Sequence, residues 1–268
     1  MMITESIIVL GGLGLLFGIF LAFVSKKFHV KNDPKIEEVL AALPGINCGA
    51  CGYAGCAAYA EAVATNKDVP VDLCIPGQKD AAEKVAKILG REASGKKTKL
   101  VAQLKCNGGK KEAGEKYEYS GVKTCKAASI VVGGPKSCSY GCIGYGDCTR
   151  VCNFNALSMG ENGLPVVDKD ECVACGACVK ECPKGLFKLV PHEKKVHVLC
   201  SSKDPGKIVT KVCKVGCIAC MLCVKACKFD AIHVVDNLAE LDYSKCTMCG
   251  DCVIACPRKI IVDEGKKA

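Results

Sequence analysis

Large aromatic side chains are scarce in this sequence of 268 residues, which contains no tryptophan and only 5% aromatic residues. Few large side chains are therefore available to fill an apolar core.

Groups suited to acid–base or nucleophilic catalysis are also few. The four histidines, His29, His192, His197 and His233, are scattered and have no plausible nucleophile beside them. No glycine-rich nucleotide fingerprint follows a strand-like run, and GGPKS at 133–137 lacks the spacing of a phosphate loop. These absences argue against a catalytic residue, a flavin site or a nicotinamide site in this chain.

Cysteine is abundant instead, with 24 residues, close to a tenth of the chain. Such counts occur in secreted disulfide scaffolds and in metal-binding proteins, and spacing separates the two classes. A complete C-x2-C-x2-C-x3-C run occurs three times, at 172–182, 217–227 and 246–256. The run is typical of bacterial ferredoxins, in which three close thiolates bind one [4Fe–4S] cube and the fourth reaches the partner cube. Structural zinc, the alternative, usually pairs two C-x2-C knuckles across a longer gap.

The cysteine pattern also repeats along the chain. The five cysteines from Cys125 to Cys152 recur with the same spacing from Cys200 to Cys227, and the run at 172–182 recurs at 246–256. Two tandem bacterial-type dicluster ferredoxin units explain these matches, and we assign them to residues 100–197 and 198–268. Alternating runs at 195–199 and 231–235 predict strands beside the cluster loops. The apolar core of these units is too thin to fold without metal, so we expect the metal-free form to be largely unstructured.

Crossed ligation assigns three complete sites in these units. They are Cys217, Cys220 and Cys223 with Cys256; Cys246, Cys249 and Cys252 with Cys227; and Cys172, Cys175 and Cys178 with Cys152.

A fourth site lacks one ligand, because Tyr145 stands where the second copy has a cysteine. This site retains Cys142, Cys148 and Cys182, and the nearest candidate for its missing ligand is Cys138. The sequence leaves open that Cys125 and Cys138 exchange roles.

Assigning Cys138 in this way leaves four cysteines without a site. They are Cys106, Cys125, Cys200 and Cys213. Four thiols are what one further cluster needs, so we predict a sixth [4Fe–4S] cluster, with free buried thiols as the alternative.

Residues 29–90 predict a small, mainly helical domain with one more [4Fe–4S] cluster. Its candidate ligands are Cys48, Cys51, Cys56 and Cys74, and a short helix is expected at 81–89. Zinc remains the alternative at this less generic spacing. The charged, small residues at 91–99 predict a linker.

The N-terminal residues 1–28 contain an uncharged stretch at 7–24, followed at once by Lys26 and Lys27. This stretch reaches the lower limit for a membrane-spanning helix, which is about 18 residues, and no signal-peptide pattern is present. We predict a single-pass anchor in the cell (inner) membrane, with the N-terminus outside and the clusters on the cytoplasmic side.

The formal charge of +9 does not indicate nucleic-acid binding. Each cube with four thiolates carries about −2 when oxidised, so six cubes contribute roughly −12. The protein with its clusters is then near neutral or slightly acidic.

A series of fully cysteine-ligated cubes is suited to passing single electrons, and we take electron transfer as the function. A cluster storage or assembly scaffold is the alternative from another class. It is disfavoured because scaffolds keep labile, under-ligated clusters, whereas these sites have four thiolates. A third possible function is that of an adaptor for membrane partners whose fold is held by zinc.

The motifs PGINCGACGYAGC at 44–56, KCNGG at 105–109 and GGPKSCSYGCIGYGDC at 133–148, with a second ferredoxin unit, resemble the B subunits of Rnf complexes. These complexes are ferredoxin:NAD+ oxidoreductases that couple electron transfer to ion pumping. The resemblance implies that reduced ferredoxin is the electron donor and that membrane-embedded partners receive the electrons. It also implies that other subunits bind flavin and NAD.

Overall fold

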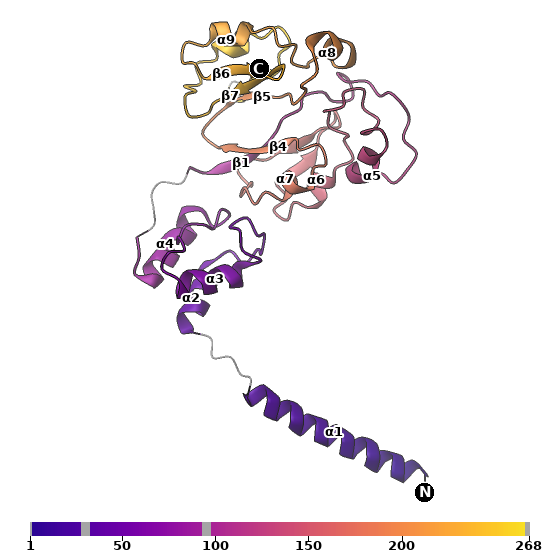
Figure 1. Cartoon of the computed structure of the whole chain (residues 1–268), viewed down its shortest axis with the longest axis vertical. Helices are drawn as coiled ribbons and strands as arrows, with labels where there is room; N and C mark the ends of the chain where they lie inside the picture. Colours follow the sequence, from indigo (N-terminus) through magenta and orange to yellow (C-terminus); the bar gives the residue numbers. More distant parts are fainter. Residues whose placement is uncertain (1, 28–32, 93–97, 266–268) are drawn as a thin grey trace.

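The computed structural model describes residues 2–27, 33–92 and 98–265. Its helices and strands follow one another from a long N-terminal helix, through a body of three helices, to a larger body of short helices and strands (Figure 1). The C-terminal part of the chain, with helix α9, lies at the end of the molecule opposite to helix α1 (Figure 1).

Helix α1 (Met2–Lys27) covers the stretch for which the sequence predicts a helix. Among the described residues, however, none of the helices combines the length and apolar character that crossing a membrane requires. The predicted single-pass anchor at 1–28, and the membrane topology and location derived from it, are therefore wrong.

Helices α2 (Pro34–Ala42), α3 (Cys56–Thr65) and α4 (Gln78–Leu89) form the helical body. The side chain of Asp33 caps α2 by accepting a hydrogen bond from the backbone N–H of Lys35, and Gly90 ends α4 in the left-handed conformation that glycine favours. The three helices enclose a small apolar core that includes Val39, Tyr59 and Val85. The predicted helix at 81–89 is confirmed, whereas most of the predicted linker, at 93–97, lies outside the described residues.

The first copy of the repeat is built from two antiparallel strand pairs and three short helices. Strand β1 (Leu100–Leu104) pairs with β4 (Phe187–Pro191), and β2 (Leu157–Met159) pairs with β3 (Pro165–Val167). The helices are α5 (Cys125–Ile130), α6 (Asp147–Arg150) and α7 (Ala177–Glu181).

The second copy repeats this plan. Strand β5 (Val196–Val198) pairs with β8 (Ile261–Asp263), and β6 (Ile232–Val235) pairs with β7 (Leu238–Leu241). Its helices are α8 (Gly206–Val212), α9 (Leu222–Ala226) and α10 (Asp251–Ala255). The strands predicted at 195–199 and 231–235 are confirmed.

Each copy has its own small core, and the cysteines make up much of it. In the first copy Cys142, Cys148 and Cys178 are buried beside aliphatic side chains such as Leu186 and Val101. In the second copy several cysteines occupy the same kind of environment beside aliphatic side chains. Because the thiols lie inside the cores, the packing of each copy is tied to what its thiols bind.

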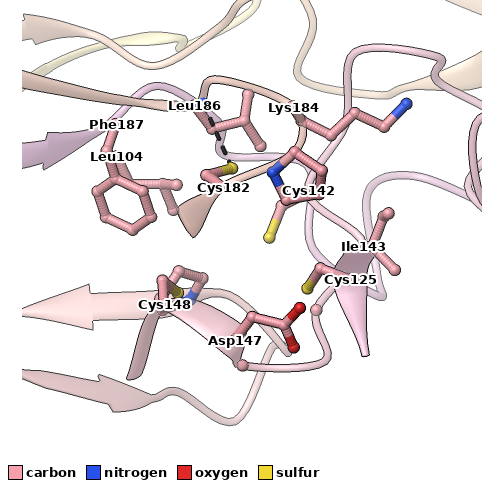
Figure 2. Close-up of a pocket in the computed structure, with 14 residues that line it drawn as sticks. Leu104, Cys125, Cys142, Ile143, Asp147, Cys148, Cys182, Lys184, Leu186 and Phe187 are labelled. Atoms are coloured by element: carbon pink, nitrogen blue, oxygen red, sulfur yellow. Dashed lines mark hydrogen bonds between the residues drawn. The ribbon is translucent and has the colours of Figure 1, made fainter. Parts of the chain in front are cut away.

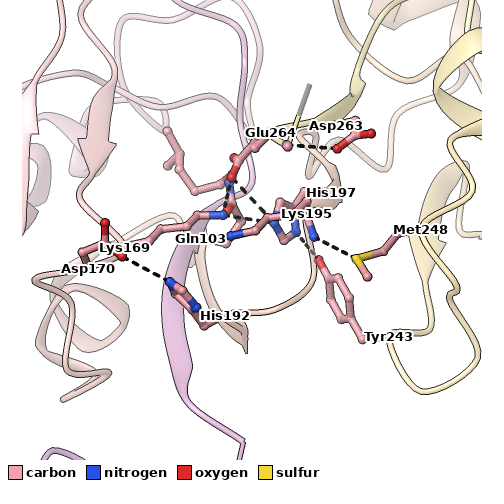
Figure 3. A network of polar contacts seen from close by, with 12 residues as sticks. Gln103, Lys169, Asp170, His192, Lys195, His197, Tyr243, Met248, Asp263 and Glu264 are labelled. Atoms are coloured by element: carbon pink, nitrogen blue, oxygen red, sulfur yellow. Dashed lines mark hydrogen bonds and ion pairs between the residues drawn. The ribbon is translucent and has the colours of Figure 1, made fainter. Parts of the chain in front are cut away.

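A buried polar network joins the two copies (Figure 3). His197 on β5 is fully buried, and its Nε2 lies 3.1 Å from the Nζ of Lys169, which follows β3 in the first copy. Its Nδ1 lies 2.9 Å from the hydroxyl of Tyr243, and Lys169 also forms an ion pair with Glu264 (Figure 3). The network holds a loop of the first copy against strands of the second.

Candidate iron–sulfur sites

All 24 cysteines fall into six groups of four. Numbered along the series in which they adjoin one another, the groups are site 1 (Cys48, Cys51, Cys56, Cys74), site 2 (Cys152, Cys172, Cys175, Cys178), site 3 (Cys125, Cys142, Cys148, Cys182), site 4 (Cys106, Cys138, Cys200, Cys213), site 5 (Cys217, Cys220, Cys223, Cys256) and site 6 (Cys227, Cys246, Cys249, Cys252).

Sites 2 to 6 each surround a cavity, and the cavities are of similar size. The empty space in them, part of it open to solvent, runs from about 300 Å³ at site 6 to about 380 Å³ at site 3. A zinc ion held about 2.3 Å from four sulfurs would leave no such space between them. Within the part of the chain that the structure describes, no group of histidine, cysteine or acidic side chains is drawn together tightly enough to hold a single metal ion. Cavities of one size, each with four thiols, fit a [4Fe–4S] cube.

Site 3 answers the question raised by Tyr145 (Figure 2). Its cavity is lined by Cys142, Cys148 and Cys182, as the sequence predicts, but the fourth cysteine is Cys125 rather than Cys138. Cys125 is the first residue of α5, a helix that Thr124 caps by accepting a hydrogen bond from the backbone N–H of Ala127. The exchange of roles that the sequence leaves open is thus the arrangement in the structure.

Tyr145 itself does not line this cavity; its ring lies 6.0 Å from that of Tyr119. The backbone around Gly146 adopts a positive φ of 75° as it turns into α6. The loop therefore still delivers Cys148 to the cavity although one of its cysteines is absent.

Site 4 is assembled from two equivalent halves. Cys106 lies two residues after strand β1, and Cys200 lies two residues after strand β5. Cys138 precedes Cys142 by four residues, and Cys213 precedes Cys217 by four.

The spacing within these halves explains why a fixed repeat shift pairs the wrong cysteines of the two copies. The chain from Cys106 to Cys138 is more than twice as long as the chain from Cys200 to Cys213. The extra chain in the first copy carries Cys125. A fixed repeat shift pairs Cys125 with Cys200, whereas the strands pair Cys106 with Cys200. The position of a cysteine after a strand was the signal that could have separated them.

Sites 2, 5 and 6 contain the cysteines that crossed ligation predicts. In each of these sites the third cysteine of the loop lies in a short helix, and the residue just before that helix adopts a positive φ: Gly176, Gly250 and, in site 5, Met221 at 61°. This turn lets the loop wrap around its cavity.

Burial makes the free thiolates unfavourable in these sites. It raises the pKa of Cys148 to about 12, with the charge of Cys125 as the next contribution, and raises the pKa of Cys138 to about 11. Burial followed by the charges of neighbouring thiolates raises the pKa of Cys178 to about 12. The iron of a bound cluster would supply the positive charge that allows four such thiolates to lie together.

Backbone N–H groups point at several of the sulfurs. Ala102 donates to Cys172 Sγ at 3.3 Å, and Ala231 donates to Cys227 Sγ at 3.4 Å. Hydrogen bonds of this kind stabilise the charged form of a ligating sulfur and influence the potential of the cluster it holds. The donor set therefore fits the cluster: four thiols, a cavity and N–H donors.

At the start of the series, site 1 lies near enough to site 2 for their charges to interact, and site 2 adjoins site 3 through packed helices. Burial raises the pKa of Cys175 in site 2, and the thiolate of Cys48 in site 1 adds to that rise. Helix α6, which carries Cys148 of site 3, packs against α7, which carries Cys178 of site 2.

The contacts continue through site 4 into the second copy. Burial raises the pKa of Cys106 in site 4, and the nearby backbone N–H of Cys142 in site 3 opposes that rise. The backbone N–H of Cys217 in site 5 donates to Cys200 Sγ in site 4 at 3.4 Å. Helices α9 and α10, which begin beside sites 5 and 6, pack against each other. The six sites thus form one continuous series.

Three segments match known protein families. Residues 43–76 match the FeS family of iron–sulfur cluster domains, and residues 141–186 and 216–261 each match a family described as "4Fe-4S dicluster domain". The chain therefore contains an iron–sulfur cluster domain over site 1 and two [4Fe–4S] dicluster domains, one over residues of sites 2 and 3 and one over residues of sites 5 and 6.

Relatives match along nearly the whole chain. The B subunit of the ion-translocating oxidoreductase complex of Methanosarcina acetivorans is 45% identical over 97% of this chain and 97% of its own length. The B subunit of the Na(+)-translocating ferredoxin:NAD(+) oxidoreductase complex of Acetobacterium woodii is 47% identical over 96% of this chain and 78% of its own. The chain belongs to the family of Rnf complex B subunits. The B subunit of the proton-translocating ferredoxin:NAD(+) oxidoreductase complex of Clostridium ljungdahlii is a further relative, 45% identical over 94% of this chain and 89% of its own.

Membership in this family confirms the resemblance drawn from the sequence motifs. B subunits of this family are components of oxidoreductase complexes, so partner subunits are implied. The cysteine-rich sites are consistent with electron relay within such a complex.

Proposed function

We propose that this chain holds six [4Fe–4S] clusters, one in each of sites 1 to 6, and relays electrons from reduced ferredoxin to partner subunits of an ion-translocating ferredoxin:NAD+ oxidoreductase. Its relatives in Acetobacterium woodii and Clostridium ljungdahlii are named as subunits of ferredoxin:NAD(+) oxidoreductase complexes, which supports ferredoxin as the electron donor and NAD+ as the final acceptor of the complex. Flavin and NAD chemistry belongs to the partner subunits, because the sequence of this chain has no nucleotide fingerprint.

The observation that carries this proposal is the unbroken series of four-thiol sites from the helical body to the C-terminal unit. A cube with four thiolates accepts and gives up one electron at a time when it is bound. The protein holds such groups at fixed positions, excludes bulk water with aliphatic side chains, and keeps neighbouring sites in contact. A scaffold that releases clusters would not need this continuity between sites.

Site 4 has a particular place in the series, because it takes two cysteines from each ferredoxin copy. Cys106 and Cys138 come from the first copy, and Cys200 and Cys213 come from the second. We infer that site 4 is the electronic link between the copies. Electrons then enter in the C-terminal unit and leave through site 1.

The test is the iron and acid-labile sulfide content of the protein purified without oxygen. Six cubes correspond to about 24 iron and 24 sulfide per chain. About 20 of each would mean that site 4 holds free thiols, and stoichiometric zinc with little iron would overturn the relay. Rapid transfer of iron to apo-protein acceptors would favour the scaffold function instead.

A further inference from the structure

The two ferredoxin copies differ in how they cover equivalent clusters. Ala174 and Cys175 of site 2 correspond in the repeat to Met248 and Cys249 of site 6. Ala174 is only 3% exposed and Cys175 is half-buried, whereas Met248 is 39% exposed and Cys249 is exposed. The same face of the repeat is therefore covered in the first copy and open in the second.

One neighbour of this face in the first copy belongs to the chain itself. The helical body of α2 to α4 lies beneath the first copy (Figure 1), and Cys48 of site 1 is close enough for its charge to act on Cys175. On this face, then, another cysteine site adjoins the ferredoxin copy. The corresponding face of the second copy has no such neighbour among the described residues.

Apolar side chains surround the open face of site 6. Phe229 is 45% exposed and Met248 is 39% exposed, and both line the cavity together with Thr247 and Cys249. An exposed sulfur bracketed by apolar side chains allows a second protein to approach while water is expelled between them.

Lysines stand around these apolar residues. Lys194 donates from Nζ to the carbonyl of Cys246 at 2.6 Å, and the backbone N–H of Lys195 lies 3.4 Å from the sulfur of Met248. Lys228 is 80% exposed while it pairs with Asp251, and Lys245 pairs with Asp230. Asp251 and Asp230 offset the charges of Lys228 and Lys245, so the positive charge at the face comes from Lys194 and Lys195. A donor cluster with four thiolates is negative, and this positive charge favours its approach.

We propose that the open face of site 6, formed by Phe229, Thr247, Met248 and Cys249, is where reduced ferredoxin docks. The external carrier takes the place on the second copy that the helical body takes on the first. One electron leaves the ferredoxin cluster, which is oxidised, and one electron reduces site 6; no bond is made or broken. This proposal rests on the proposed function, and it assigns the place where electrons enter.

The chain contains a matched pair of residues with which to test this assignment. Met248 directly precedes the exposed Cys249 of site 6, and Met221 directly follows the exposed Cys220 of site 5. Both methionines have left-handed backbones, with φ of 63° and 61°, and similar exposure, 39% and 46%. Met248→Glu and Met221→Glu therefore introduce the same charge in the same backbone setting beside two different sites.

The experiment measures the rate at which reduced ferredoxin reduces the full-length protein, with a small-molecule reductant as reference. We expect Met248→Glu to slow reduction by ferredoxin by about tenfold, and Met221→Glu to change it less than twofold. Phe229→Ala, which changes no charge, should also slow it. The iron content of each variant and its reduction by the small molecule are measured alongside, and the rate with ferredoxin is compared relative to them, so that damage to a cluster is separated from loss of docking.

Equal slowing by both glutamate variants, slowing by Met221→Glu alone, or no slowing by Met248→Glu would overturn the docking assignment. Failure of the proposed function looks different. In that case the unmodified protein itself would not be reduced by ferredoxin, although the small-molecule reductant would still reduce its clusters.

Discussion

At the scale of single residues, the most informative pair is Cys125 and Cys138. Both belong to the first copy and both precede Cys142, yet they face different cavities. A substitution of either one leaves three thiols at a site that needs four. Double substitutions show which cysteines share a site, because a second substitution at the same site removes no further cluster.

We expect Cys125→Ala to lower the iron content by about four per chain, the content of one cube. Adding Cys142→Ala should cause little further loss, because both residues belong to site 3. Adding Cys213→Ala should lower the content by about eight in total, because two sites are then damaged. Iron analysis of the three variants checks this.

The alternative assignment, with Cys138 in site 3, predicts a different pattern of iron loss. If Cys138 belonged to site 3, the pair Cys138→Ala and Cys142→Ala would lose only about four irons. In the structure that pair spans sites 3 and 4, so we expect about eight.

At the scale of secondary-structure elements, the network around His197 couples strand β5 to the loop after β3 (Figure 3). Burial, followed by the charge of Lys169, lowers the pKa of His197 to about 4. The imidazole is therefore neutral, with Nε2 accepting from Lys169 and Nδ1–H donating to Tyr243. The network depends on this protonation state.

Stability should accordingly decrease on acidification. Above the unfolded pKa of about 6.5 both states are neutral, and the full stability is present. As the pH falls from about 6.5 towards 4, the unfolded chain binds a proton that the folded chain does not, at a cost of up to about 3 kcal/mol.

Thermal unfolding at pH 7.5 and pH 5.5, without oxygen, measures this effect. His197→Gln should reduce the dependence on pH, whereas His233→Gln, at an exposed histidine, should retain it. An unchanged pH dependence in His197→Gln would mean that other groups, such as the cluster ligands, control acid unfolding.

At the scale of the whole molecule, the series of sites leads from the C-terminal unit to the helical body. Site 4 is placed where the two ferredoxin copies meet, and each copy supplies half of its thiols. Loss of one of these thiols should interrupt the series while leaving both copies with their own sites.

We expect Cys213→Ala to confine electrons from ferredoxin to sites 5 and 6. The protein should then accept about two electrons from ferredoxin instead of about six, at one electron per cluster. A small-molecule reductant should still reduce the five clusters that remain, about five electrons.

Thr210→Ala, at an exposed position on α8, serves as the control and should accept the full number of electrons. If Cys213→Ala accepted about five electrons from ferredoxin, another contact between the copies would have to carry them. The loop of Lys169, beside the second copy, would then be the place to search.

The sequence by itself determined the chemistry of the sites and the family. The spacing of the ferredoxin runs follows from how a short loop brings thiols around a cube, and this requirement is local. It therefore predicted sites 2, 5 and 6 with their crossed cysteines, and the cysteines of site 1. The strands at 195–199 and 231–235 are likewise local, as is the helix ending at Leu89.

Only the tertiary structure decided which cysteine completes site 3, which four form site 4, and that the described helices include no membrane span. Cys125 and Cys138 lie in or beside a stretch of chain that is much longer in the first copy than in the second, so neither counting nor a fixed repeat shift could place them. Site 4 forms between two copies, and a contact between distant segments depends on how strands β1 and β5 are positioned, not on local spacing. The open face of site 6 is decided in the same way, because exposure depends on which neighbouring body covers a surface.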